Sequence, residues 1–146
     1  MNVTKEAKVT FVNCSFTSES FNSVRVIKGA VAKFYKCEFL GSKQNGLNIT
    51  DAECLVQSCS FHSNSLSSIQ IRNSSVEERK ENENFKRVPT FAVIQDCKIF
   101  SNLAGGIEVT DNSFAVLKNN KIFDNKEVSI FKNFCCSYLT TIKLRR

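Results

Sequence analysis

Short runs of alternating apolar and polar residues recur along the chain every 22 to 23 residues. The recurring segments are FVNCSF, FYKCEF, VQSCSF, IQDCKIF and LKNNKIF, which align on Cys14, Cys37, Cys59, Cys97 and Asn120. Successive anchors are separated by 23, 22, 38 and 23 residues. A repeat of nearly constant length is typical of solenoid proteins, in which each repeat forms one structural unit.

Three further places in each repeat are apolar. Large apolar residues lie three positions before each anchor and two positions after it. The first set is Phe11, Phe34, Val56, Ile94 and Leu117, and the second is Phe16, Phe39, Phe61, Ile99 and Ile122. An apolar–polar–apolar triplet follows, at 24–26, 47–49, 69–71, 107–109 and 128–130. Because this alternation has a period of two and the runs are short, the pattern predicts β-strands and disfavours helices.

Repeats of this kind predict an all-β fold, a single-stranded parallel β-helix (solenoid) of about five coils. One coil cannot bury its inward side chains alone, so each strand must pair with its equivalent in the next coil. Equivalent residues then form interior columns, one of cysteines and one of Phe and Ile, stabilised by burial and ring stacking. We predict one domain over 1–146, with coils at 9–30, 31–53, 54–75, 91–113 and 114–132.

The 38-residue step marks an insertion, and the chain ends need caps. Fifteen extra residues fall at 76–90, where VEERKENENFKRVPT contains eight charged residues. We expect a solvated loop or short helix there, ending at Pro89. Residues 133–146 are predicted to form a C-terminal cap, with Tyr138 to Leu144 as cap or partial sixth coil. Open ends expose strand edges, so self-association through them is also expected.

The composition indicates how the corners are made. The chain has 13 Phe but no Trp, one Pro and five Gly. Tight turns must therefore use Asn, Asp and Ser, which tolerate left-handed backbone and bond nearby backbone groups. Asn64, Asn102 and Asn125 each lie five residues after an anchor. We interpret them as corner residues that satisfy backbone amides rather than as sugar ligands.

Charge and hydropathy narrow the expected partners and location. The net charge is +6, but the basic residues are scattered apart from Lys143, Arg145 and Arg146 at the terminus. A nucleic-acid surface usually shows clustering, so we expect no nucleic-acid partner. No apolar run suits a signal peptide or reaches the ~20 residues of a membrane span. We therefore expect a cytoplasmic protein with no membrane association.

Seven cysteines are an odd number without paired C-x-x-C spacing, which argues against a disulfide framework. A column of sulfurs about 4.8 Å apart also differs from the tetrahedral arrangement of a zinc site. We expect Cys14, Cys37, Cys54, Cys59 and Cys97 to be buried and inert, with no metal site and no cofactor. Cys135 and Cys136 are expected to pack in the C-terminal cap.

A binding face is predicted from the middle residues of the triplets. They should point outward in one column: Arg25, Asn48, Gln70, Glu108 and Ser129. A flat polar sheet face suits a peptide or a glycan, and the charged insertion beside it would extend or gate the contact. The competing interpretation is an ordinary solvated face.

Catalytic residues are weakly represented. Asp51 and Asp111 share one position in the repeat, two coils and about 9.6 Å apart, with Glu108 near Asp111. This spacing is at the edge of the roughly 6.5–9.5 Å found in inverting glycosidases. No basic residue lies between them to act as an activator. His62, the only histidine, follows the inward Phe61 and is expected at a surface corner rather than as a general base.

Together, the five aligned segments resemble the parallel β-helix repeats of the pectin-lyase-like superfamily over residues 9–132. This resemblance implies right-handed winding. The cysteine-rich core without a signal looks closer to intracellular members, such as the Shc SH2-domain-binding and spindle-associated proteins and the β-helix F-box proteins, than to secreted polysaccharide lyases. Since a fold does not fix a function, three hypotheses remain: a non-enzymatic scaffold that binds protein partners, a carbohydrate-binding or polysaccharide-cleaving protein, and an inactive copy.

Overall fold

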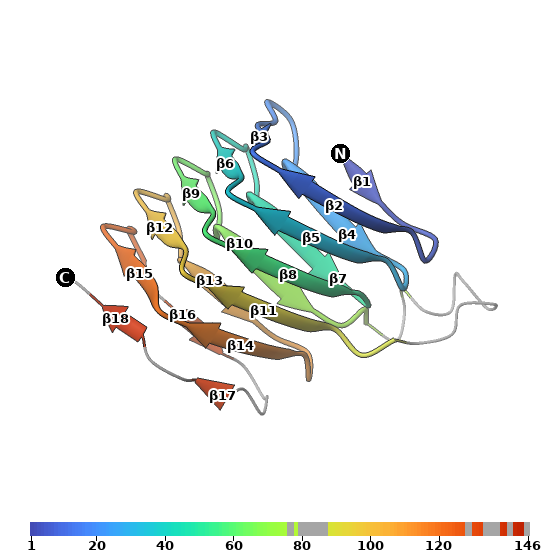
Figure 1. Ribbon diagram of the computed structural model, residues 1–146. Helices are drawn as coiled ribbons and strands as arrows, with labels where there is room; N and C mark the ends of the chain where they lie inside the picture. Colours follow the sequence, from blue (N-terminus) through green and yellow to red (C-terminus); the bar gives the residue numbers. More distant parts are fainter. Residues whose placement is uncertain (76–77, 79–87, 128–129, 133–137, 140–141, 145–146) are drawn as a thin grey trace.

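Three parallel β-sheets wind into one solenoid (Figure 1). The computed structural model describes residues 1–75, 78, 88–127, 130–132, 138–139 and 142–144. Sheet A contains β1 (Asn2–Val3), β4 (Val24–Ile27), β7 (Leu47–Thr50), β10 (Ile69–Arg72), β13 (Ile107–Val109) and β16 (Ile130–Lys132). Sheet B contains β2 (Lys8–Val12), β5 (Val31–Tyr35), β8 (Glu53–Gln57), β11 (Phe91–Gln95), β14 (Phe114–Lys118) and β17 (Tyr138–Leu139). Sheet C contains β3 (Ser15–Phe16), β6 (Glu38–Leu40), β9 (Ser60–His62), β12 (Lys98–Phe100), β15 (Asn120–Phe123) and β18 (Ile142–Leu144).

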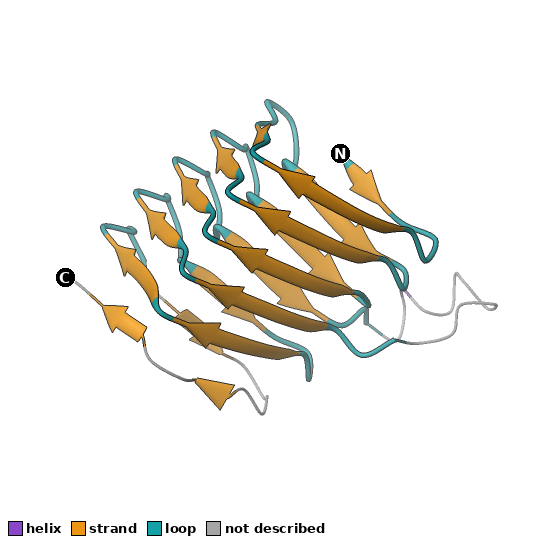
Figure 2. Cartoon of the chain, viewed as in Figure 1, coloured by secondary structure: helices purple, strands orange, loops and turns teal. Residues whose placement is uncertain are grey.

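The predicted repeat register is confirmed by the strand pairing. Phe61 pairs with Phe39 on one side and with Ile99 on the other, and Ile99 then pairs with Ile122. Every pairing between successive coils is parallel, and short loops join one sheet to the next (Figure 2). Residues that share a position in the repeat therefore lie over one another, as the sequence predicted.

The interior consists of apolar columns that run along the solenoid axis. Phe39 and Phe61 are fully buried and their rings stack, with centroids 4.4 Å apart. The inward residues of the first coil are only partly buried, because no coil covers them on their outer side within sheets B and C. Val9, Phe11 and Phe16 are examples. Stability therefore comes from each coil covering the apolar surface of the next.

The cysteine column points into the corner between sheets B and C. Each buried thiol contacts the backbone carbonyl two residues before it and one in the preceding coil; in Cys59 these distances are 3.3 Å to Gln57 O and 3.5 Å to Phe34 O. Cys37, Cys59 and Cys97 are buried, and Cys14 at the end of the column is partly exposed. Asn120 continues the column, with its amide donating to Ile94 O at 2.8 Å. The structure confirms that these cysteines are unpaired and that Cys37, Cys59 and Cys97 are buried, whereas the expected burial of Cys14 is only partial because it ends the column.

A second polar column closes the far corner of sheet C. Asn102 accepts the Asn64 backbone N–H at 3.1 Å, and Asn125 accepts that of Asn102 at 3.1 Å. The Asn102 side-chain amide also donates to Phe100 O and Phe61 O, at 2.9 and 3.4 Å. The bonds to the Asn64 and Asn102 N–H groups satisfy buried backbone groups that lie just beyond the strands of sheet C. The predicted role of the corner asparagines is thus confirmed.

Tight turns recur at the same three positions of the coil and use left-handed backbone. The residue before each column anchor has a positive φ, from 52° at Asn119 to 56° at Asp96. Positive φ also recurs after sheet C, at Gly41, Ser63, Ser101 and Asp124, and after sheet A, at Lys28, Asp51 and Asp111. Asn and Asp tolerate this region better than most residues. A chain with few glycines therefore makes its corners largely from polar residues, as expected.

Four features at the ends of the chain and in its long connection can be compared with the prediction. β1 precedes the predicted first coil and pairs with β4 through Val3 and Val26. The last triplet is displaced by two residues, since Glu108 pairs with Phe131 rather than with Ser129. Beyond it, β17 and β18 pair with β14 and β15, so the tail begins a sixth coil. The longest connection between sheets A and B runs from Arg72 to Phe91, where the insertion was predicted.

Parts of two predicted segments lie outside the described residues. Within the charged insertion, residues 76–77 and 79–87 are not described, and Cys135 and Cys136 of the cap also lie outside the described part.

We expect Asn102→Ala to lower the free energy of unfolding by about 2 to 4 kcal/mol. The change removes the acceptor of the Asn64 N–H and a donor to two carbonyls, and each buried group that is left unpaired costs about 1 to 3 kcal/mol. Urea denaturation followed by circular dichroism measures the difference. Gln95→Ala, which removes an outward amide from sheet B, is the matched control and should change stability by less than about 0.5 kcal/mol.

We expect the order in which the thiols are alkylated to follow their exposure to solvent. Burial raises the pKa of the Cys37 and Cys54 thiols, so little thiolate is available at mildly alkaline pH. In the native protein, iodoacetamide should modify Cys14 first and the four buried cysteines only as the protein unfolds. Mass spectrometry of tryptic peptides reads the order. Equal rates at Cys14 and Cys59 in native buffer would contradict the column.

Candidate functional site

A groove crosses the outer face of sheet A. Its larger chamber has a volume of about 720 Å³ and overlies β4, β7 and β10. A smaller chamber of about 320 Å³ continues it toward β13. Asn45, Leu66 and Gln70 line both chambers, which makes the two parts one continuous depression. The groove therefore runs across the strands, parallel to the solenoid axis.

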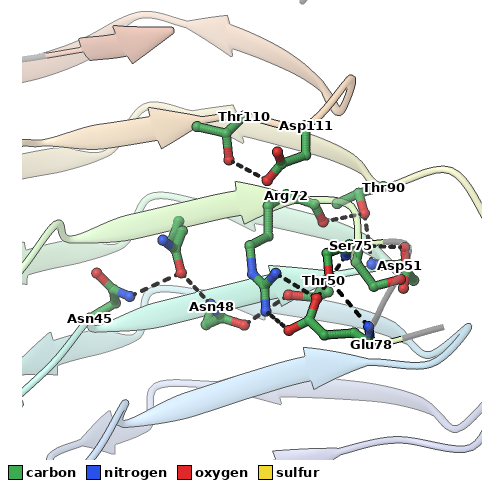
Figure 3. A network of polar contacts seen from close by, with 12 residues as sticks. Asn45, Asn48, Thr50, Asp51, Arg72, Ser75, Glu78, Thr90, Thr110 and Asp111 are labelled. Atoms are coloured by element: carbon green, nitrogen blue, oxygen red, sulfur yellow. Dashed lines mark hydrogen bonds and ion pairs between the residues drawn. The ribbon is translucent and has the colours of Figure 1, made fainter. Parts of the chain in front are cut away.

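The floor of the groove is the polar column predicted from the triplets. Asn48 donates its side-chain amide to Gln70 Oε1 at 2.6 Å, and Asn45 donates to the same oxygen at 3.3 Å. Gln70 in turn donates to Glu108 Oε2 at 3.2 Å. Figure 3 shows how Asn45 and Asn48, from one coil, converge on a single side chain of the next coil. This chain of amides fixes the floor side chains in one arrangement.

Four of the five predicted face residues lie in this groove, and the fifth prediction was wrong. Arg25, Asn48, Gln70 and Glu108 line it. Ser129 lies outside the described residues, and the position after Glu108 in the column belongs to Phe131. The physical reason is that the stacked strands keep a constant spacing of ten residues from the anchor. Ile130 lies ten residues after Asn120, as Ile107 does after Cys97.

An apolar rim, which the sequence did not reveal, borders the polar floor. Phe21 is 66% exposed and Leu66 is 46% exposed, and both line the larger chamber. They come from the loops that lead from sheet C back to sheet A, outside the aligned segments. Apolar side chains this exposed on an otherwise polar face are typical of interaction sites.

The two chambers differ in charge. Arg25 and Arg72 line the larger chamber, whose described lining contains no acidic residue. Glu108 and Glu127 line the smaller chamber, whose described lining contains no basic residue. A ligand lying along the groove would therefore meet positive charge at one end and negative charge at the other.

Arg72 forms a two-pronged ion pair with Glu78 at the side of the groove (Figure 3). The two nitrogen–oxygen distances are 3.0 and 2.9 Å. Glu78 also accepts the Ser75 backbone N–H at 2.7 Å, while Ser75 Oγ accepts the Glu78 N–H at 3.2 Å. This reciprocal pair has the pattern of a capping box. The Arg72 guanidinium, aided by the Ser75 amide, lowers the pKa of Glu78 to about 2.

The three carboxylates considered for catalysis have separate partners. Asp51 was expected on the outward face but is buried, where its carboxylate accepts the Ser74 N–H at 3.1 Å. Its turn backbone folds the side chain back beside the start of the insertion. Asp111 is exposed and accepts a bond from Thr110 Oγ1 at 3.0 Å, one coil beyond Arg72 (Figure 3). Glu108 accepts from Gln70 on the groove floor. The structure gives these residues positions in different hydrogen-bond networks.

His62 was expected at a corner, but it lies within strand β9 of sheet C. Its Nε2 is 3.0 Å from Glu38 Oε1, and its ring stacks on Phe100 with centroids 5.0 Å apart. Phe100 stacks in turn on Phe123. The corner prediction misses by one residue, because β9 ends at His62 and the turn begins at Ser63. His62 belongs to an outward aromatic column, on the opposite face of sheet C from the inward Phe61.

Sheet B carries a second outward surface that the sequence did not reveal. Phe91 and Phe114 pair in neighbouring strands and are 41% and 40% exposed. The next outward pair, Val93 and Val116, is partly buried. These residues were assigned to strands, but only the position of the core decides which of two alternating apolar sets points inward.

The described residues contain no group of three or more His, Cys, Asp or Glu side chains placed to hold a metal ion. They also include no helix that is long and apolar enough to span a membrane.

Comparison with known proteins gives one result. The family model described as a right-handed beta helix region matches residues 1–140. Neither the curated proteins nor the solved structures gave a match.

We expect the stability contributed by Glu78 to depend on pH. Its pKa falls from 4.5 to about 2 on folding, so ionised Glu78 stabilises the protein above pH 4.5 and loses this effect as the pH falls toward 2. Because Glu78 is 47% exposed, screening by solvent limits the effect to about 1 kcal/mol or less. Urea unfolding of the wild type and Glu78→Gln, near neutral pH and near pH 2, measures it. A stability difference that grows with acidification would contradict the assignment.

Proposed function

We propose that this chain, which belongs to the right-handed β-helix family, is a non-enzymatic interaction module that binds an extended segment of a protein partner in the sheet A groove. The polar floor and apolar rim of that groove carry the proposal.

An extended peptide suits this groove for geometric reasons. Alternate side chains of an extended chain point to opposite sides. One set can then pack on Phe21 and Leu66 at the rim, while polar groups reach the amides of Asn48 and Gln70 on the floor. The floor amides are already ordered by hydrogen bonds to one another, so binding costs little additional side-chain entropy. The groove thus offers a prearranged surface to a flexible partner.

The hydrogen bonding of the acidic residues supports a binding role rather than catalysis. A glycosidase-type reaction needs two carboxylates facing one bond of the substrate. Here Asp51 is buried against Ser74, and Glu108 is held by Gln70. Each of these two carboxylates is therefore engaged by a residue of a neighbouring coil.

The unpaired cysteines favour a role inside the cell. The five described cysteines are free, and disulfides are rare in the reducing cytosol. We extend the proposal to a cytoplasmic scaffold comparable in kind to the intracellular β-helix proteins that the sequence resembles.

A carbohydrate ligand is the second candidate. The observation that favours it is the side-chain amides of the floor, Asn45, Asn48 and Gln70, which both donate and accept hydrogen bonds as sugar hydroxyls require. The exposed Phe21 ring at the rim offers an apolar face beside them. A glycan array separates the two candidates, since the peptide proposal predicts no glycan whose binding depends on the groove.

We expect Leu66→Ala to weaken binding of peptides selected on the full chain from a random phage library by about tenfold. Loss of a contact that buries a leucine costs about 1.5 kcal/mol or more, and 1.4 kcal/mol corresponds to a factor of ten. Fluorescence polarisation of a labelled synthetic peptide measures the change. Leu103→Ala is the matched control, because Leu103 is 50% exposed but does not line either chamber.

The control should bind the peptide within about twofold of the wild type, since no peptide contact is lost. Equal losses in the two variants would place peptide binding elsewhere. A library without binders, together with a glycan whose affinity falls in Asn48→Ala, would replace the peptide proposal with the carbohydrate one.

A further inference from the structure

Two arginines line the larger chamber, and they differ in their partners. Arg25 forms no ion pair with any residue in the described part of the chain. Arg72 is held by Glu78 through both terminal nitrogens. The planar guanidinium fork matches a carboxylate with two parallel hydrogen bonds, which makes such a pair both strong and geometrically selective. Arg72 therefore already has the geometry of an occupied carboxylate site.

The occupant comes from the chain itself. Glu78 lies six residues after Arg72, beyond the end of β10 and at the start of the longest connection between two sheets. Its side chain is more exposed than that of Arg72, at 47% against 25%. The carboxylate thus approaches the arginine from the solvent side of the groove, the side from which a ligand would also come.

We infer that Arg72 is a carboxylate-binding subsite of the sheet A groove, that Glu78 occupies it as an internal ligand in the unbound protein, and that an acidic side chain of the bound partner takes the place of Glu78. This inference rests on the proposed peptide-binding function and assigns to it the chemical class of the partner.

The exchange replaces the Glu78 carboxylate at Arg72 with a carboxylate of the partner. The guanidinium charge of Arg72 is therefore paired both before and after the exchange. Glu78 keeps a second bond, from the Ser75 N–H, when it leaves Arg72. Internal occupancy reduces the apparent affinity for a carboxylate ligand to the intrinsic affinity multiplied by the fraction of molecules in which the site is empty. Glu78 thereby weakens the binding of acidic segments, which must displace it from Arg72, and leaves segments that do not contact Arg72 unaffected.

The charge of the groove sets the direction of the bound segment. The acidic part must lie over β4 to β10, where Arg25 and Arg72 line the larger chamber. The part that passes over β13 meets Glu108 and Glu127 and should not be acidic. Complementary charge of this kind selects partners and fixes their register more than it adds affinity.

The test compares Glu78→Gln with the wild type by fluorescence polarisation of labelled hexaglutamate in physiological salt. Glutamine preserves the bond to the Ser75 N–H, since Glu and Gln serve equally in a capping box, but it removes the charge that competes for Arg72. We expect hexaglutamate to bind about threefold to tenfold more tightly to this variant. Hexaglutamine should bind both proteins equally.

Two further variants separate this effect from a general change in charge. Glu53→Gln removes the same charge from the exposed outer face of sheet B and should leave hexaglutamate affinity unchanged. Arg72→Gln combined with Glu78→Gln should abolish the gain. Gains of equal size in Glu78→Gln and Glu53→Gln, or a gain that survives loss of Arg72, would overturn the inference.

The outcome also separates this inference from the proposed function. If Glu78→Gln leaves hexaglutamate binding unchanged while library peptides still depend on Leu66, the carboxylate subsite is wrong and the groove function stands. If hexaglutamate gains affinity through Arg72 but library peptides ignore Leu66, the subsite stands and the rim has been misassigned. Circular dichroism of each variant verifies that the solenoid is intact.

Discussion

Parallel pairing of each coil with the next, in register, is the constraint on which the whole structure depends. It places residues of the same repeat position over one another, so an inward position must suit its own coil and both neighbours. Phe39 and Phe61 meet this demand by stacking, and Asn64 and Asn102 meet it by passing hydrogen bonds from coil to coil. Corner groups outside the ladders need such side chains because buried backbone N–H and C=O groups must be paired. The thiols of the cysteine column donate weaker hydrogen bonds to backbone carbonyls at the corner between sheets B and C. Asn120, at the same repeat position, donates a stronger amide hydrogen bond to Ile94 O.

The same register shapes the outer surface. Outward residues also form columns, so neighbouring side chains on sheet A bond to each other and hold the groove floor in one arrangement. The floor therefore contributes shape and rigidity, while selectivity falls to groups that do not belong to the columns. These are the loop residues Phe21 and Leu66 and the arginine at the end of β10. In a solenoid the coils are the invariant part, and loops and strand ends carry the differences that distinguish partners.

Sequence periodicity was sufficient to predict the repeat, the inward columns and the polar face, because side-chain identity at those positions is dictated by stacking. Sequence periodicity failed at positions where stacking between coils does not determine the side chain or its direction. The last triplet was placed at 128–130 by its apolar–polar–apolar pattern, whereas the constant distance from Asn120 selects Ile130 to Lys132. Asp51 was grouped with the exposed Asp111 because the two share a position in the repeat, but Asp51 is buried and its carboxylate accepts the Ser74 N–H near the start of the long connection. The sequence pattern could not predict the groove rim, because Phe21 and Leu66 lie in loops, where period-two alternation does not indicate which way a side chain points.

A rigid stack also limits how binding can be controlled. Moving one strand would break its hydrogen bonds with both neighbouring strands, so a hinge within the coils is costly. Side chains at the ends of strands can change partners at much lower cost. Arg72 is such a group: it ends β10, faces the groove, and is paired with a residue outside the coils. Competition between Glu78 and a partner carboxylate needs only a change of side-chain contacts, with every interstrand hydrogen bond kept. Control by exchange of carboxylates at a fixed arginine is therefore the form of regulation that this architecture permits at least cost in stability.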